Sequence, residues 1–287
     1  MWVLRIIWIV LPVTAGPAVG DALNGWSHGA RVVAEVLLWA AWAVALVALL
    51  APRPLGLTIT RIVAPAFVGV AVATAWGTSA PRLAIAIVTT LLAAILATRP
   101  AFGRASAEGI AYGDELRFPL KVPPALAVGA VPVAIALVAA GIATGPLLLA
   151  SGRTVAGVVA LVIGLPLAAF LFRALHGLST RWVVLVPAGV TIVDPMTLAD
   201  PVLFMRERIA GLAPVGAGAA VAGLDLRLGA SVGAIALHLT DDAQIVTSGR
   251  GRRRGERVTT RTLVFAPVDA ATLLTAVTRR VDQREIK

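Results

Sequence analysis

Cysteine is absent from the 287-residue chain, and lysine, tyrosine and acidic residues are scarce. Without cysteine the chain can form no disulfide, no thiolate nucleophile and no Cys-ligated metal site. The three histidines, His28, His176 and His238, lack the spacing of metal ligands. No Walker A motif occurs, and Gly216-Ala-Gly218 lacks the third glycine of a dinucleotide-binding loop. The sequence therefore predicts no catalytic residue, no cofactor and no metal.

Charge is also scarce, and it is unbalanced. Charged residues make up 14% of the chain, against about 25% in soluble domains, while 59% of the residues are hydrophobic and mean hydropathy is +0.90. The formal net charge of +10 comes mostly from arginine. Many of these arginines lie between apolar segments, where membrane orientation accounts for them. We therefore expect the lipid bilayer, and not a nucleic acid, as the partner of this charge.

What the sequence does contain is six long apolar segments, which predict six transmembrane helices within residues 1–177. A bilayer core of about 30 Å needs roughly 20 apolar residues at 1.5 Å rise each. Hydrocarbon offers no water to backbone groups, so spanning segments of this kind are helical. The segments are Trp2–Gly20, Val32–Leu50, Leu57–Trp76, Leu83–Thr98, Val122–Ala150 and Val155–Phe172.

The first segment has a second interpretation as a cleaved signal peptide. Met1–Arg5 would be its charged start, Ile6–Leu11 its apolar stretch and Ala18–Gly20 its cleavage site. Because the apolar stretch continues without a polar break until Asp21, we favour a membrane helix. Cleavage would leave five helices and the same orientation for the rest.

The positive-inside rule predicts the orientation. With six helices and both termini in the cytoplasm, the inner loops hold six basic residues and the outer loops hold three. The inner residues are Arg53, Arg61, Arg99, Arg104, Arg117 and Lys121, and the outer ones are Arg31, Arg82 and Arg153. We therefore expect a multi-pass protein of the bacterial cell (inner) membrane with both termini cytoplasmic.

Residues 178–287 have the pattern of a separate β-rich domain. Short β-branched runs separated by turn residues predict strands, and Pro187-Ala-Gly189 predicts a hairpin turn. Apolar residues at helical spacing predict a helix over Ala270–Val281, with Asp269 as its N-cap. The predicted strands are Trp182–Val186, Val190–Val193, Val202–Met205, Ile235–Leu239 and Val258–Phe265. Several strands closed by a C-terminal helix outline a pleckstrin-homology-like (PH-like) domain.

Three stretches carry a resemblance to a known family. The segment Arg173–Gly189 with the following Asp194-Pro195 and Ala199–Phe204, the loop Tyr112–Lys121 and the run Leu57–Arg61 together resemble a group of uncharacterised actinobacterial polytopic membrane proteins. The resemblance implies a cytoplasmic PH-like tail and implies no activity. Many PH domains bind phosphoinositides through basic residues of the first hairpin, and here the hairpin Val183–Val193 has none. A protein-interaction or self-assembly role for the tail is favoured for that reason.

The densest charge on the chain is a basic run in the predicted domain. It contains Arg250, Arg252, Arg253, Arg254 and Arg257. One hypothesis places these side chains against anionic lipid, at about 1 kcal/mol for each well-placed charge. The alternative is a solvated loop between two strands, with glycines at its bends.

The loop between the fourth and fifth helices is a second candidate site. It holds Tyr112, Asp114, Glu115, Arg117 and Lys121, so that opposite charges fall within one short segment. One hypothesis is a surface that contacts a partner, a lipid head group or the tail. The alternative is an interfacial elbow whose charges pair locally and whose aromatic residues lie at head-group level.

Glu35 is the acidic residue that falls inside a predicted membrane helix. Intramembrane ionisable groups are functional candidates by default. However, Arg31 precedes Glu35 by four residues, so a local ion pair is the alternative.

Gly141–Gly145 has the GxxxG spacing that lets two membrane helices approach closely.

These features together predict a non-catalytic, membrane-anchored interaction or assembly protein. A small transporter or channel is the alternative, and it would need a polar pathway through the helices. An enzyme acting on a lipid-linked substrate is a third hypothesis. It would need polar groups that converge near Tyr112–Lys121 and Arg173–His176.

Overall fold

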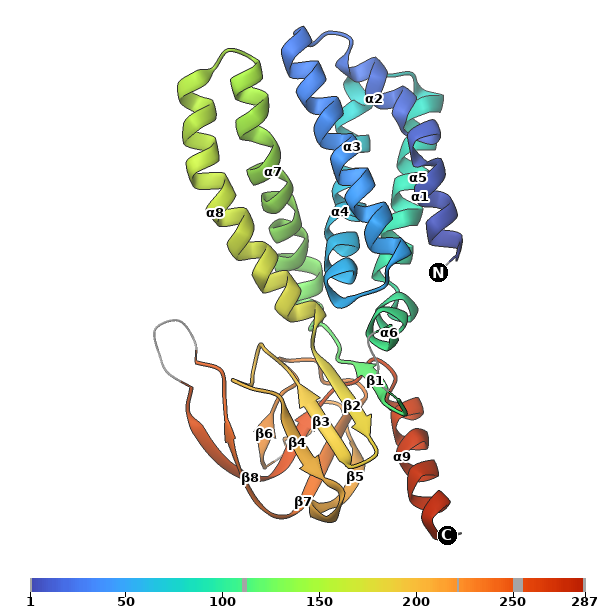
Figure 1. Cartoon of the computed structure of the whole chain (residues 1–287), viewed down its shortest axis with the longest axis vertical. Helices are drawn as coiled ribbons and strands as arrows, with labels where there is room; N and C mark the ends of the chain where they lie inside the picture. The colour runs from blue at the N-terminus through green and yellow to red at the C-terminus, as the bar shows by residue number, and fades with distance from the viewer. Residues whose placement is uncertain (1, 110–112, 221, 250–254, 286–287) are drawn as a thin grey trace. The chain divides into compact units, whose positions relative to one another are not determined.

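The computed structural model of the 287-residue chain describes residues 2–109, 113–220, 222–249 and 255–285. It contains six long apolar helical spans followed by a β-rich region, which confirms the coarse architecture expected from the sequence (Figure 1). The chain divides into two compact units. The first comprises residues 1–106 and 128–176, and the second comprises residues 107–127 and 177–287. The second unit thus includes residues 107–127, which the sequence predicted as a loop of the membrane domain.

The six spans are Trp2–Leu23, His28–Leu50, Pro54–Trp76, Ala80–Thr98, Leu126–Ala150 and Thr154–Ser179. The predicted fourth segment is therefore long enough to span, and the fifth begins four residues later than predicted. The helices are α1 (Trp2–Thr14), α2 (Gly16–Leu23), α3 (His28–Leu50), α4 (Pro54–Ala73), η1 (Thr74–Trp76), α5 (Ala80–Thr98), α6 (Pro100–Glu108), η2 (Leu126–Ala130), α7 (Val131–Ala150) and α8 (Thr154–Ser179).

The sequence predicted the first span as one helix. In the structure the span breaks at Ala15, between α1 and α2. Two prolines account for the break. Pro12 and Pro17 have no N–H to donate to the carbonyls of Trp8 and Val13. The indole of Trp42 replaces one of these donors, since its Nε1 donates to the Trp8 carbonyl at 2.8 Å.

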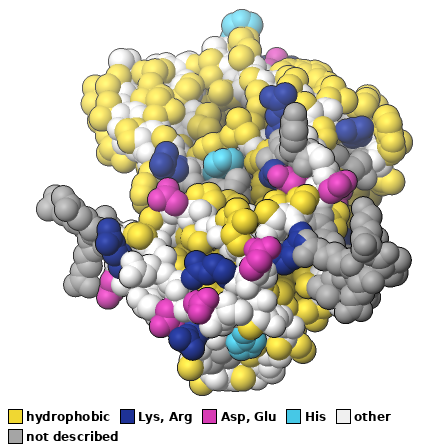
Figure 2. All heavy atoms as spheres, turned by 60° about the horizontal axis from the view of Figure 1, so that its bottom comes forward, with side chains coloured by type: hydrophobic (Ala, Val, Ile, Leu, Met, Phe, Trp, Pro, Cys, Tyr) yellow, Lys and Arg dark blue, Asp and Glu magenta, His cyan; other side chains and the backbone are white. Residues whose placement is uncertain are grey.

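The helical unit is packed with small side chains inside and large ones outside. Alanines such as Ala18, Ala45 and Ala64 are fully buried, whereas Val47, Val162 and Phe170 are about two-thirds exposed. Figure 2 shows hydrophobic side chains over most of the visible surface of the helices. Soluble proteins rarely expose apolar surface on this scale, and membrane helices commonly approach one another through small residues. This distribution fits a surface that faces lipid.

Helices α7 and α8 cross at glycines, as the GxxxG spacing predicted. A Cβ built on Gly141 would lie 2.6 Å from the carbonyl oxygen of Gly164, and one on Gly145 would lie 2.5 Å from Leu161 Cγ. Neither backbone can therefore accept a side chain without moving the other helix. The predicted close approach of two helices is confirmed at this pair.

We expect Gly141→Leu to destabilise the α7–α8 pair by about 1–3 kcal/mol, because the added side chain forces the two backbones apart. Thermal unfolding of the purified full chain in detergent measures the change. Gly69→Leu is the matched control, since Gly69 also lies within a membrane helix and a Cβ there meets nothing within 4 Å. Equal thermal stability of the two variants would contradict the close packing.

The described residues of the second unit form two four-stranded sheets and a C-terminal helix. The first sheet has the order β1-β2-β3-β4, with every neighbouring pair antiparallel, and the second has the order β5-β7-β8-β6. In the second sheet β6 runs parallel to β8. The elements are β1 (Leu116–Pro119), β2 (Trp182–Val186), β3 (Gly189–Val193), β4 (Val202–Met205), η3 (Arg206–Arg208), β5 (Ile209–Val215), β6 (Leu224–Asp225), β7 (Ala234–Val246), β8 (Arg257–Phe265) and α9 (Ala270–Glu285).

One hydrophobic core joins both sheets and α9. It includes Phe118 of β1, Ile192 of β3, Leu237 of β7 and Phe265 of β8, with Leu273 of α9 fully buried against them. The predicted cap of this helix is also present, because the Thr272 N–H donates to Asp269 Oδ1 at 3.1 Å. The β-rich unit is therefore a packed domain with its own core.

Candidate functional site

The predicted loop site becomes part of a sheet. Leu116–Pro119 forms β1 and pairs with Trp182–Val186, so that the Cα atoms of Phe118 and Val183 are partners. Glu115 forms an ion pair with Arg117 at 3.0 Å, and the Arg117 guanidinium lies 5.6 Å from the Trp182 ring centroid. The ion pair is local to the β1 segment, whereas the strand pairing and the contact between Arg117 and Trp182 link this segment to β2.

The other loop candidates have separate positions. The Lys121 ammonium donates to the Val232 carbonyl at 2.8 Å, and Asp114 is exposed. Tyr112 lies outside the described residues. Among the described members, Arg117 and Lys121 therefore contact the domain itself.

Most of the predicted basic site also falls outside the described residues, namely Arg250, Arg252, Arg253 and Arg254. Arg257 is described: it is exposed at the start of β8, where it pairs with Val246 of β7. The lipid-contact hypothesis for this run stays a prediction.

A buried ion pair lies where the loop and the tail meet. Arg181 Nε and Nη2 each donate to one carboxylate oxygen of Asp194 at 2.8 Å, and both side chains are at most 1% exposed. The same guanidinium donates to the Lys121 carbonyl at 3.1 Å and to the Leu226 carbonyl at 2.6 Å. Bidentate pairing with two further acceptors satisfies a charge that would otherwise be costly to bury. Arg181 therefore ties β1, β2, β3 and the β6 region together.

The sequence did not predict this pair. Arg181 stood out only as a basic residue after the last helix, and Asp194 only within the resemblance to a family. The available signal was a charged residue at each outer end of the apolar runs Trp182–Val186 and Val190–Val193. Two such residues become partners only when the runs form a hairpin, as they do here.

A second ion pair shapes the turn that holds Leu226. The Asp225 carboxylate accepts hydrogen bonds from Arg227 Nε and Nη2 at 2.9 and 2.8 Å. The Arg227 side chain lowers the pKa of Asp225 through these bonds. Asp225 and Arg227 flank Leu226 in the chain, so their ion pair holds the turn whose Leu226 carbonyl accepts a hydrogen bond from Arg181.

A polar contact within the helical unit joins Leu57–Arg61 to Arg173–Gly189, two of the stretches on which the predicted resemblance rests. Thr58 Oγ1 of α4 lies 2.9 Å from His176 Nδ1 of α8, and Thr58 is buried. The Phe172 ring stacks on the His176 ring, with centroids 6.4 Å apart. Thr58 Oγ1 also donates to the Pro54 carbonyl of its own helix at 3.2 Å, so the contact with His176 is the one that links α4 to α8.

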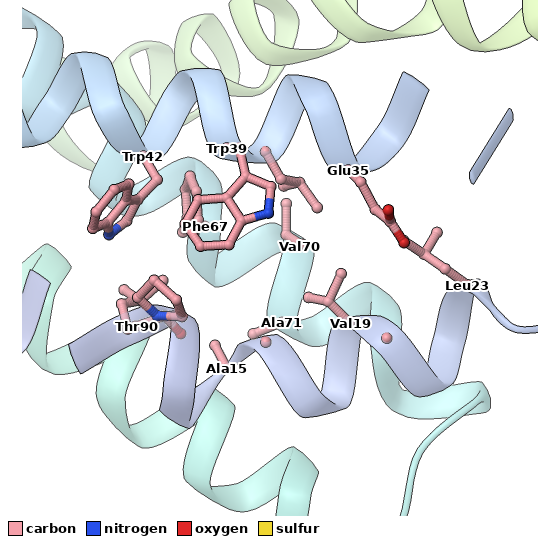
Figure 3. Close-up of a pocket in the computed structure, with 15 residues that line it drawn as sticks. Ala15, Val19, Leu23, Glu35, Trp39, Trp42, Phe67, Val70, Ala71 and Thr90 are labelled. Carbon is pink, nitrogen blue, oxygen red and sulfur yellow. The ribbon is translucent and has the colours of Figure 1, made fainter. Parts of the chain in front are cut away.

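The helical unit contains a pocket of about 220 Å³ between the broken first span, α3, α4 and α5. Figure 3 shows Trp39, Trp42 and Glu35 of α3 on one side and Ala15, Val19 and Leu23 of the first span on the other. Apart from Glu35 and Thr90, its lining side chains are apolar or absent. The lining residues are Leu11, Pro12, Ala15, Gly16, Val19, Gly20, Leu23, Glu35, Leu38, Trp39, Trp42, Phe67, Val70, Ala71 and Thr90.

Aromatic contacts fix the wall of this pocket. The Trp39 and Trp42 rings meet edge to face at a centroid distance of 5.4 Å, and the Trp8 and Phe67 rings do the same at 5.4 Å. Trp8 Nε1 donates to the Trp42 carbonyl at 3.0 Å, which complements the reverse bond from Trp42 to the Trp8 carbonyl. At this wall α1 and α3 are therefore linked by a hydrogen bond in each direction.

Glu35 lies at the end of the pocket near Leu23. Arg31 Nε donates to its carboxylate at 2.9 Å, so the local ion pair considered for the sequence is present. Arg31 Nη1 also donates to Asn24 Oδ1 at 3.2 Å. A polar cluster thus stands at one end of an apolar pocket.

Comparison of the chain with protein-family models, with curated proteins and with solved structures found no match. The resemblance to actinobacterial membrane proteins stays a prediction, so a proposal of function has only residues and geometry to rest on.

Proposed function

We propose that the protein is a non-catalytic, membrane-anchored interaction or assembly protein whose β-rich unit carries the binding surface. The observation behind the proposal is the composite domain: the strand β1 comes from between two membrane spans and completes the sheet formed by the tail. A domain made in this way is fixed to its membrane helices at two points of the chain. Such fixation suits an anchored binding platform.

The domain we propose is PH-like. Two four-stranded sheets share one core and are followed by a C-terminal helix. Two features depart from a continuous PH-like tail, since the first strand comes from an earlier loop and β6 is parallel to β8. The first hairpin also lacks basic residues, which favours a protein partner over a phosphoinositide.

We place both termini and the β-rich unit on the cytoplasmic face of a bacterial cell membrane. Residues 107–127 follow the fourth span and residues 177–287 follow the sixth, so a six-span topology puts both on the same side. Their presence in one compact unit supports that topology. The excess of arginine and lysine in the inner loops then assigns this side to the cytoplasm.

The proposed partner surface is the outer face of β4. Leu203 and Met205 are 47% and 44% exposed there, while Phe204 between them is buried in the core. An exposed pair of large apolar side chains on a regular strand suits a hydrophobic contact with a membrane or cytoplasmic protein.

A small transporter or channel remains the alternative, and it is less well supported. Four of the hydroxyl side chains buried in the helical unit, those of Thr60, Thr74, Thr90 and Ser106, donate to carbonyls of their own helical segments. Their hydroxyls are used locally, whereas a transport pathway needs polar groups free to face a substrate. The same buried set offers little to an enzyme acting on a lipid-linked substrate.

Crosslinking in cells followed by affinity purification tests the interaction role. We expect a reproducible partner with the full chain and its loss with Leu203→Asp/Met205→Asp, because charge on the outer face of β4 opposes an apolar contact. The control is Val246→Asp/Thr259→Asp, which adds the same charge to exposed positions of the second sheet. Purification of the chain without a partner in every form would contradict the proposal.

A further inference from the structure

The pocket in the helical unit is distinct from the partner surface proposed above, and its chemistry points to a ligand. We propose that it holds one acyl chain of a zwitterionic membrane phospholipid, with the head group at Arg31 and Glu35. The void of about 220 Å³ lies within the membrane-spanning helices, where acyl chains are the surrounding solvent.

The lining favours hydrocarbon over water. A buried water needs two to four polar partners, and the lining offers few: the Thr90 hydroxyl is already engaged, and Glu35 stands at one end of the pocket. Thr90 Oγ1 donates to the Ala86 carbonyl at 2.7 Å, and the Glu35 carboxylate accepts from Arg31. The remaining walls are aliphatic side chains, the Trp39, Trp42 and Phe67 rings, and glycines. An empty apolar void loses the dispersion contacts that a chain would restore.

Small residues at the helix break create the space. Gly16 and Gly20 of α2 both line the pocket, one helical turn apart, and a Cβ on either would meet nothing within 4 Å. Larger residues at these positions would fill much of the void from the α2 side. The sequence therefore leaves open a volume that ordinary side chains could have closed.

The charges at one end of the pocket suit a head group that carries both signs. Arg31 and Glu35 are each about two-fifths exposed, so both retain surface for a ligand. Nearby in the chain, Asp21 at the end of α2 pairs with Arg82 of α5 at 2.7 Å. This end thus carries two cations and two anions, with no net charge. A phosphate has Arg31 to bind and an ammonium has Glu35, whereas a head group that carries only a phosphate brings no cation to Glu35.

Photocrosslinking of the full chain in vesicles tests the site. The probe is phosphatidylethanolamine with a diazirine on one acyl chain, and mass spectrometry locates the adducts. We expect adducts on peptides that contain Val19, Trp39 and Val70, and their loss in Gly16→Leu/Gly20→Leu. The control Gly69→Leu adds a side chain to a helical glycine that does not line the pocket and should keep them. Equal labelling of the two variants would overturn the proposal, as would even labelling of all exposed apolar faces.

Two further measurements cover the head group and the stability of the variant. Phosphatidylglycerol carrying the same diazirine should label the pocket less, and equal labelling would overturn the zwitterionic assignment. If the double variant does not purify as a folded protein, native mass spectrometry of the unaltered chain replaces it. One retained phospholipid after detergent exchange supports the site, and complete loss of lipid overturns it.

Discussion

Replacing Arg181 by methionine is expected to cost the β-rich unit about 3–5 kcal/mol of unfolding free energy. The substitution leaves the Asp194 carboxylate buried at 0% exposure with no cation beside it, and removal of one partner from a buried ion pair has this cost. It also removes the donor that binds the Lys121 and Leu226 carbonyls. Against a typical domain stability of about 5–15 kcal/mol, the loss is large.

Chemical denaturation of the full chain in detergent measures this loss. Replacement of the other tryptophans makes Trp182 the fluorescent probe of unfolding. The control is Asp242→Asn, which breaks the exposed pair of Asp242 and Arg261 at 2.7 Å. An exposed pair contributes about 0–1 kcal/mol, so this variant should behave almost like the unaltered chain. If Arg181→Met were as stable as Asp242→Asn, the ion pair of Arg181 and Asp194 would not stabilise the β-rich unit.

The tail alone, residues 177–287, is expected not to fold. Without β1 it loses Phe118 and Leu120, which are each 5% exposed in the core, and full burial of each such side chain contributes about 1.5–3 kcal/mol. It also loses the strand pairing with β2 and the bond from the Lys121 N–H to the Ala266 carbonyl. Exposure of the β2 edge would further favour aggregation.

Linking residues 113–122 to the start of the tail through a flexible linker should restore the fold, because it returns β1 to its place. Far-ultraviolet circular dichroism and the emission of Trp182, which is the one tryptophan in this segment, report folding. A matched chain with Phe118→Asp in the linked strand should remain unfolded. A tail that folds cooperatively without any added strand would contradict the composite domain.

Much of the architecture was predictable because its signals are local. The six spans follow from apolar length alone, and the hairpin of β2 and β3 follows from two β-branched runs around Pro187-Ala-Gly189. The C-terminal helix and its Asp269 cap follow from spacing and cap chemistry. In each case the residues that determine the element lie within a few positions of one another.

The elements that sequence reasoning missed depend on distant partners. β1 lies in a charged loop, and its pairing residue for Phe118 is Val183, far along the chain. β5 has the sequence Ile-Ala-Gly-Leu-Ala-Pro-Val, which has little strand propensity, and it forms because β7 offers it an edge. The break at Ala15 could not be predicted from the prolines alone, because prolines in membrane segments also occur in continuous, kinked helices.

The sequence by itself determined that this is a chain of six membrane-length helices with a β-rich region after them, since apolar length and strand periodicity are properties of short segments. Only the tertiary structure decided that the β-rich unit takes its first strand from between two spans. It also decided that Arg181 and Asp194 form a buried ion pair, and that a pocket opens beside the broken first span. Each of these depends on contacts between residues far apart in the chain, and their pairing is set by packing, burial and geometry that no local pattern contains.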